Sequence, residues 1–113
     1  MRNGNFLHYK NYTGSVSFSE EDAYFHGKVI GIKALITFEG NSVHSITDDF
    51  HKAVDEYLKF CTSKGIEPEK PFKGSFNVRI SADLHRKLAL TAYTKGISLN
   101  TLVEDAISQT VNA

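Results

Sequence analysis

Three carboxylates stand side by side at Glu20, Glu21 and Asp22, and His26 follows four residues after the last of them. Carboxylate and imidazole groups are side chains with which metal-dependent nucleases hold their ions. Such a site needs ligands from separate elements that converge on one ion, whereas adjacent residues in a turn point apart. We therefore interpret residues 20–22 as a charged turn, one that a basic partner could contact.

Five histidines and one cysteine complete the side chains suited to acid–base, nucleophilic or metal chemistry. His44 and His51 are seven residues apart, and two helical turns would separate them by about 10 Å, too far to share one ion. Cys61 lies among regularly spaced apolar residues, which favours a small core residue over a nucleophile. The sequence thus predicts no catalytic residue, no metal site and no cofactor, and we expect a protein that is not an enzyme.

A further group of polar side chains suits recognition. Residues 75–80 alternate between polar and apolar side chains, which is the period of a half-buried strand. Asparagine and arginine can each make two hydrogen bonds to the edges of adenine and guanine, and a two-stranded ribbon fits the major groove. The predicted DNA base contacts are Ser75, Asn77 and Arg79, and the opposite, apolar face carries Phe76, Val78 and Ile80.

Two short helices are expected after this strand. Ser81 is placed to cap the first helix, which Gly96 ends, and Ser98 is placed to cap the second. The start of a helix carries unpaired N–H groups that favour anions. We therefore predict DNA phosphate contacts at Ser98, Leu99 and Asn100.

One strand and two short helices cannot close a core alone. The simplest solution is a two-fold dimer in which the two strands pair antiparallel. This segment resembles the ribbon-helix-helix DNA-binding fold of the Arc and MetJ type, and the resemblance covers about 34 residues. The expected dimer core consists of Phe76, Val78, Ile80, Leu84, Leu88, Leu102, Val103 and Ile107.

The first part of the chain has a different pattern. Strands are expected over residues 12–19, 24–30 and 35–39, followed by a long amphipathic helix that Ser42 caps and Gly65 ends. Residues 1–11 are polar and without period, so we predict an irregular segment there. Residues 66–73 carry both prolines of the chain, which indicates a short, stiff linker.

The chain is therefore predicted to be an α+β protein with two small domains. The first is β-β-β-α over residues 12–65, and the second is a β-α-α module over residues 74–113. The net charge is zero, and the second module holds four basic and three acidic residues. Because no strong basic field exists, DNA affinity has to come from a few placed contacts and from dimerisation. No membrane-length apolar run is present, and a cytoplasmic location is expected.

Three stretches together resemble the HicB family of bacterial antitoxins: YTGSVSFSEEDAYFHGKVIGI, FHKAVDEYLKFC and PEKPFKGSFNVRI. The resemblance runs from about Tyr12 to the end of the chain. It implies an N-terminal domain similar to a truncated RNase H fold and, in one branch of the family, a ribbon-helix-helix module. It also implies a protein that neutralises a small RNA-cleaving toxin, HicA, and represses its own operon as a homodimer or higher oligomer on operator DNA.

Two other interpretations remain open at this point. The chain could be an RNase H-like nuclease, active or degenerate, that its second module tethers to DNA. It could also be a stand-alone ribbon-helix-helix repressor whose N-terminal domain senses a small ligand. A nuclease assay with Mg²⁺ or Mn²⁺ separates the first alternative, and a neighbouring gene for a small basic protein would favour the antitoxin.

Overall fold

The computed structural model describes residues 6–113. Its strands are β1 (Phe6–Tyr9), β2 (Tyr12–Ser15), β3 (Ser17–Ser19), β4 (Tyr24–Ile30) and β5 (Thr37–Gly40), and its helices are α1 (Val43–Lys64), α2 (Ala82–Lys95) and α3 (Leu99–Val111). The α+β class is confirmed, with five antiparallel strands and three helices among these residues. The chain forms two compact units, one ending at Ser75 and the other spanning Phe76–Ala113.

The sheet of the first unit is built from consecutive hairpins. Its strand order is β1-β2-β4-β3, with β5 pairing to β4, and every pairing is antiparallel. The expected hairpin across residues 20–23 is confirmed, because Ser17, Phe18 and Ser19 of β3 pair with β4. The expected third strand is present, although it runs from Thr37 to Gly40. The predicted strand over residues 12–19 is interrupted at Val16, where the chain passes from β2 to β3.

The segment predicted to be irregular contains β1, which is a correction to the sequence-based boundary. Phe6–Tyr9 pairs with β2, and the two-residue turn between them places Lys10 and Asn11 at φ +50° and +70°. Positive φ at both turn residues suits a tight hairpin, and asparagine tolerates that conformation better than most residues. The strand was missed because its four residues carry no pattern beyond one alternation. The remainder of that segment, residues 1–5, lies outside the described residues.

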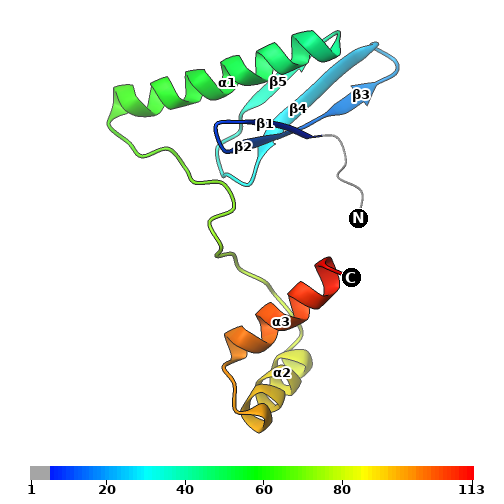
Figure 1. Ribbon diagram of the computed structural model, residues 1–113, viewed down its shortest axis with the longest axis vertical. Helices are drawn as coiled ribbons and strands as arrows, with labels where there is room; N and C mark the ends of the chain where they lie inside the picture. Colours follow the sequence, from blue (N-terminus) through cyan, green and yellow to red (C-terminus); the bar gives the residue numbers. More distant parts are fainter. Residues whose placement is uncertain (1–5) are drawn as a thin grey trace. The chain divides into compact units, whose positions relative to one another are not determined.

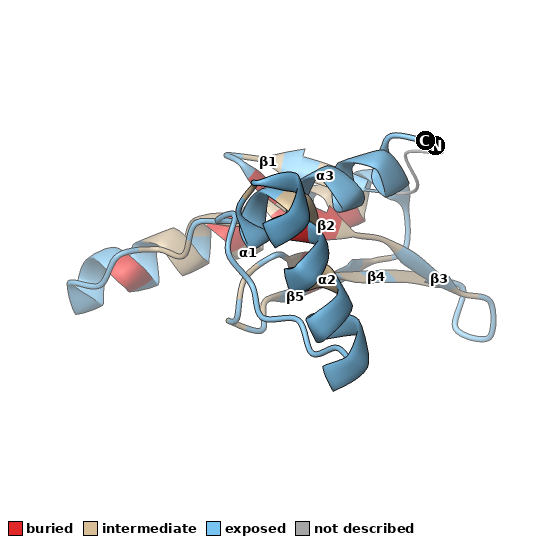
Figure 2. Cartoon of the chain, turned by 90° about the horizontal axis from the view of Figure 1, so that it is seen from below, coloured by how far each residue is buried: buried red, intermediate tan, exposed pale blue. Residues whose placement is uncertain are grey.

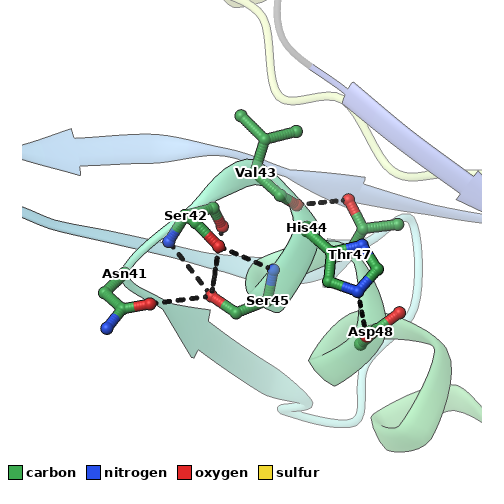
Figure 3. Close-up of polar contacts among 7 residues, drawn as sticks. All are labelled: Asn41, Ser42, Val43, His44, Ser45, Thr47 and Asp48. Carbon is green, nitrogen blue, oxygen red and sulfur yellow. Dashed lines mark hydrogen bonds and ion pairs between the residues drawn. The ribbon is translucent and has the colours of Figure 1, made fainter.

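The long helix α1 begins and ends where the sequence predicts. Ser42 accepts a hydrogen bond from the Ser45 backbone N–H at 3.0 Å, and the Ser45 hydroxyl lies 3.0 Å from the Ser42 N–H, which completes a reciprocal capping box (Figure 3). Gly65 ends the helix in the left-handed region at φ +66°. These local signals fix the length of the helix that covers the sheet.

The core of the first unit lies between α1 and one face of the sheet (Figure 1). Phe50 and Cys61 are fully buried on α1, which confirms Cys61 as a core residue. From the sheet, Phe38 and Tyr12 reach the same core, and the Phe38 and Phe50 ring centroids lie 4.9 Å apart. Val43, the first residue of the helix, lies outside this core and remains 70% exposed.

Polar contacts attach the β1–β2 hairpin to α1. The Tyr9 hydroxyl donates to the Asp55 carboxylate at 3.0 Å, and the Lys10 ammonium lies 2.8 Å from the same group. Lys10 is the larger cause that holds the pKa of the Asp55 carboxyl below its usual range, and Tyr9 adds to it. The ring of Tyr9 also stacks on His51, with centroids 4.0 Å apart.

The segment predicted to be a linker lies against the first unit. Residues 66–72 form hydrogen bonds with the β4–β5 connection and with Tyr12 and Tyr57. These contacts attach the segment to the unit and add to the backbone restraint of its two prolines. We call residues 66–72 the strap.

Candidate functional site

The segment expected to read DNA, residues 75–80, forms no helix or strand in the single chain. Its side chains are exposed, with Phe76 at 75% and Val78 at 64% exposure. A strand is defined by its hydrogen-bonded partner, and the described chain offers none to this segment. The predicted strand is therefore absent from the single chain, and its formation would require a pairing strand that the chain itself does not supply.

Helix α2 follows directly and is capped as predicted. The Ser81 hydroxyl accepts from the Leu84 N–H at 3.1 Å, and Gly96 ends the helix at φ +68°. In the first turn, the Asp83 carboxylate pairs with Arg86 and Lys87, both at 3.2 Å. The local structure on the C-terminal side of the predicted reading segment is thus well defined.

Asn77 and Arg79 line one shallow hollow of about 630 Å³. Val78, Ile80 and His85 complete its lining. His85 lies one turn into α2, and the sequence analysis gave it no role in recognition. The His85 N–H donates to the Ser81 carbonyl at 3.0 Å, which is the first hydrogen bond of the helix. Because Ser81 was predicted to cap this helix, its spacing of four residues from His85 could have placed His85 beside residues 77–80.

The start of α3 carries the predicted serine cap. The Ser98 hydroxyl accepts from the Thr101 N–H at 3.0 Å and donates to the Thr101 hydroxyl at 2.8 Å. This cap satisfies the third N–H of the helix, and helix geometry leaves the N–H groups of Leu99 and Asn100 without an intrahelical acceptor. All three predicted phosphate-contact residues are exposed.

The second unit shows an unusually exposed apolar surface. Ala92 is its only buried residue, and both helices are drawn almost entirely in the colour of exposed residues (Figure 2). Of the predicted dimer core, Leu88, Leu102 and Val103 are half-buried in the single chain, whereas Phe76, Val78, Ile80, Leu84 and Ile107 are exposed. An apolar surface of this kind on so small a unit indicates an interaction site.

In the first unit, residues 20–22 form the turn between β3 and β4, as predicted. The Ala23 N–H donates to the Glu20 carbonyl at 3.3 Å, and the Ser19 hydroxyl donates to the Asp22 carboxylate at 3.2 Å. The three acidic residues are exposed at the hairpin tip. Within residues 6–113, no group of three His, Cys, Asp or Glu side chains is placed to hold a metal ion.

The sheet also presents a polar face on the side away from α1. The strand register shows which residues lie on this face. Gly27 pairs with Phe38, which is buried under α1, and successive residues of a strand point to opposite faces, so the pairs on either side of this one point away from α1. The Tyr24 hydroxyl donates to the Glu39 carboxylate on that face, and this contact raises the pKa of Tyr24. Of the residues on this face, the sequence analysis named only His26, as a neighbour of the acidic turn. They include His8, Thr13, Ser17, Tyr24, His26, Lys28 and Glu39.

Comparison with known proteins adds one finding to this geometry. Residues 57–107 match the HicB family. The match covers the last third of α1, the strap, α2 and most of α3, which together are a little less than half of the chain. Similarity to this family over that stretch suggests a role related to toxin–antitoxin pairs. No curated protein and no solved structure matches the chain.

The match to the HicB family includes every predicted DNA base and phosphate contact, and it leaves the acidic turn outside. None of the described helices has both the length and the apolar character that crossing a bilayer requires.

Proposed function

We propose that this protein is the antitoxin of a type II toxin–antitoxin pair, which binds a HicA-like RNA-cleaving toxin and represses its own operon. The observation that carries the proposal is the HicB match over a segment whose Asn77 and Arg79 are exposed beside unpartnered apolar residues. The protein acts by binding and not by catalysis. It works as a homodimer or a higher oligomer.

In this proposal, residues 75–80 of two chains pair as an antiparallel ribbon of the ribbon-helix-helix type. Strand alternation then directs Phe76, Val78 and Ile80 inward, and a slip of one residue would expose all three, so the register is strongly specified. Ser75, Asn77 and Arg79 of both chains face the major groove. The N–H groups at the start of α3 hold DNA phosphates on either side of the ribbon.

The first unit binds the toxin. A five-stranded antiparallel sheet with one long helix on one face is compatible with the truncated RNase H fold that the family resemblance implies. The hairpin tip at Glu20, Glu21 and Asp22 carries three exposed negative charges. A toxin that cleaves RNA needs a basic surface to bind its substrate, and charge complementarity would favour contact there.

Operator binding by full-length variants tests the DNA part of this proposal. Arg79→Ala and Asn77→Ala should each weaken operator binding by about 1–3 kcal/mol per base contact, doubled by the two-fold symmetry, and should relax sequence preference. Arg86→Ala is the matched control, because it removes an equal charge from an exposed residue that pairs with Asp83 instead. Operator and scrambled DNA are titrated at one salt concentration, and a thermal melt verifies folding of each variant.

Two results would contradict the proposal. Operator affinity equal to that of the parent in both Arg79→Ala and Asn77→Ala would remove the ribbon as the reading surface. Incubation of the purified protein with RNA and Mg²⁺ or Mn²⁺ tests the nuclease alternative, and cleavage there would overturn the assignment as a binding protein.

A further inference from the structure

The Glu69 carboxylate makes a two-pronged contact with the backbone of the β4–β5 connection. It accepts hydrogen bonds from the Lys33 N–H at 2.7 Å and from the Ala34 N–H at 2.9 Å, one at each oxygen. Hydrogen bonds from backbone N–H groups to a carboxylate are charge-assisted and stronger than neutral ones. These donors lie 35 and 36 residues away in the sequence, so the contact is tertiary.

Two tyrosine hydroxyls hold the backbone of the same residue. The Tyr12 hydroxyl donates to the Glu69 carbonyl at 3.0 Å, and the Glu69 N–H donates to the Tyr57 hydroxyl at 3.0 Å. Tyr12 lies in the core of the unit and Tyr57 packs against that core, so both hydroxyls are carried by well-packed rings. Every polar group of Glu69 is therefore engaged.

The end of the strap is held as well. The Phe72 N–H donates to the Gly31 carbonyl at 3.3 Å, and the Phe72 ring lies where a side chain at position 31 would be, 2.7 Å from the ideal Cβ position. Phe72 itself has φ +51°, a conformation that an aromatic residue adopts only when its surroundings impose it. The strap is therefore fixed to the unit at two points, Glu69 and Phe72.

The charge of Glu69 matters for this contact. The N–H groups of Lys33 and Ala34 lower the pKa of the Glu69 carboxyl, and the positive charges of Lys33 and Lys73 add to the effect. A lowered acid pKa means that the contact is fully present above about pH 4.3, the ordinary value for glutamate, and is lost as the pH falls through the lowered value. At neutral pH the carboxylate is charged and the contact is complete.

We propose that Glu69 is a positioning residue that fixes the strap to the first unit and so reduces the free tether of Phe76–Ala113 to residues 73–75. A tether of that length spans roughly 10 Å at full extension, whereas release of the strap would free residues 66–75 and allow roughly 35 Å. The short tether confines a toxin bound to the first unit to the neighbourhood of the DNA. The structural role of Glu69 stands on its contacts, and its link to DNA reading rests on the proposed function.

Backbone ¹⁵N relaxation of the full chain without DNA tests the strap. In the parent, the amides of the strap should have order parameters near 0.85, the level of rigid backbone. In Glu69→Gln, which retains the size but replaces one accepting oxygen with a donor, the order parameters of the strap should be lower than in the parent, and the Lys33 and Ala34 amides should exchange faster with solvent. Tyr57→Phe, which retains the ring and removes the hydroxyl, should shift the strap in the same direction.

Glu67→Gln is the matched control, because Glu67 is exposed in the same segment and makes no side-chain hydrogen bond with residues 6–113. It should leave the order parameters unchanged. Order parameters below 0.6 in the parent, or a strap as rigid in Glu69→Gln as in the parent, would overturn the proposal. Because no DNA is present, this result is independent of the operator titration, whose failure would instead overturn the role given to Phe76–Ala113.

Discussion

At the scale of single residues, the first unit depends on one close approach between β2 and the core. A Cβ built on Gly14 would lie 2.6 Å from Phe38 Cζ and 2.9 Å from Phe50 Cε1. Both rings are buried and neither can move without disturbing the other, since their centroids are 4.9 Å apart. Gly14 is therefore required for space.

Gly14→Ala should lower the free energy of unfolding by about 1–3 kcal/mol, the usual cost of overpacking a core. Ser17→Ala, on the exposed side of β3, is the control and should stay within about 0.5 kcal/mol. Denaturant unfolding of the full chain measures both. A Gly14→Ala variant as stable as the parent would show that the two rings can be displaced at little cost.

Residue-level prediction from sequence succeeded where the determinant is local. Ser42, Ser81 and Ser98 all cap helices as predicted, because capping involves only the next three residues. Glu69 was missed, because nothing in its immediate sequence indicates two backbone N–H groups more than 30 residues away. From the sequence alone, a glutamate between two prolines is interpreted as part of a solvated linker.

At the scale of elements, the strands were harder to predict than the helices. β1 has four residues and depends on pairing with β2, and the segment 75–80 has a clear alternation but no partner in the single chain. Strand formation is decided by neighbours that the local sequence does not name. The candidate site shares this property, since the alternation of residues 75–80 can be recognised in the sequence, while the proposed ribbon would need a pairing strand that the single chain does not supply.

The second unit makes the element-scale prediction. Leu102 is half-buried within the single chain, and exposed Leu84 and Ile107 lie on the same pair of helices. Leu102→Asp would place a charge in the expected shared core, at a cost of several kcal/mol, and the full chain should dissociate. Sedimentation velocity at micromolar concentration measures this. Ser108→Asp, which introduces the same charge at an exposed position on α3 outside the predicted dimer core, is the control and should sediment with the same mass as the parent.

Two outcomes of the sedimentation experiment would contradict this prediction. A parent chain that sediments as a monomer while its second unit is folded would rule out obligate dimerisation. An unchanged oligomer in Leu102→Asp would place the interface elsewhere.

At the scale of the whole molecule, the proposal assigns toxin binding to the first unit and DNA binding to the second. The boundary between the two units differs from the one predicted from the sequence. Residues 66–73 were predicted to be a linker after a domain of residues 12–65, whereas the first compact unit extends to Ser75 and includes β1. Composition placed the boundary at the prolines, but the strap is part of the unit through Glu69 and Phe72. A truncation has to respect these contacts.

A chain of residues 1–75 should therefore bind the toxin as the full chain does and should fail to bind operator DNA.

A chain of residues 1–65 lacks the strap and leaves the hydroxyls of Tyr12 and Tyr57 without their partners at Glu69. Loss of a partner by a partly buried polar group costs about 1–3 kcal/mol, so the shorter chain should melt at least 4 °C or so lower. Co-purification with the candidate toxin, the small basic protein expected from the neighbouring gene, measures toxin binding. Thermal melts of the two truncated chains measure the difference in stability. Toxin binding by the full chain alone would contradict the division of labour, and equal melting of the two truncations would show that the strap adds nothing to the stability of the first unit.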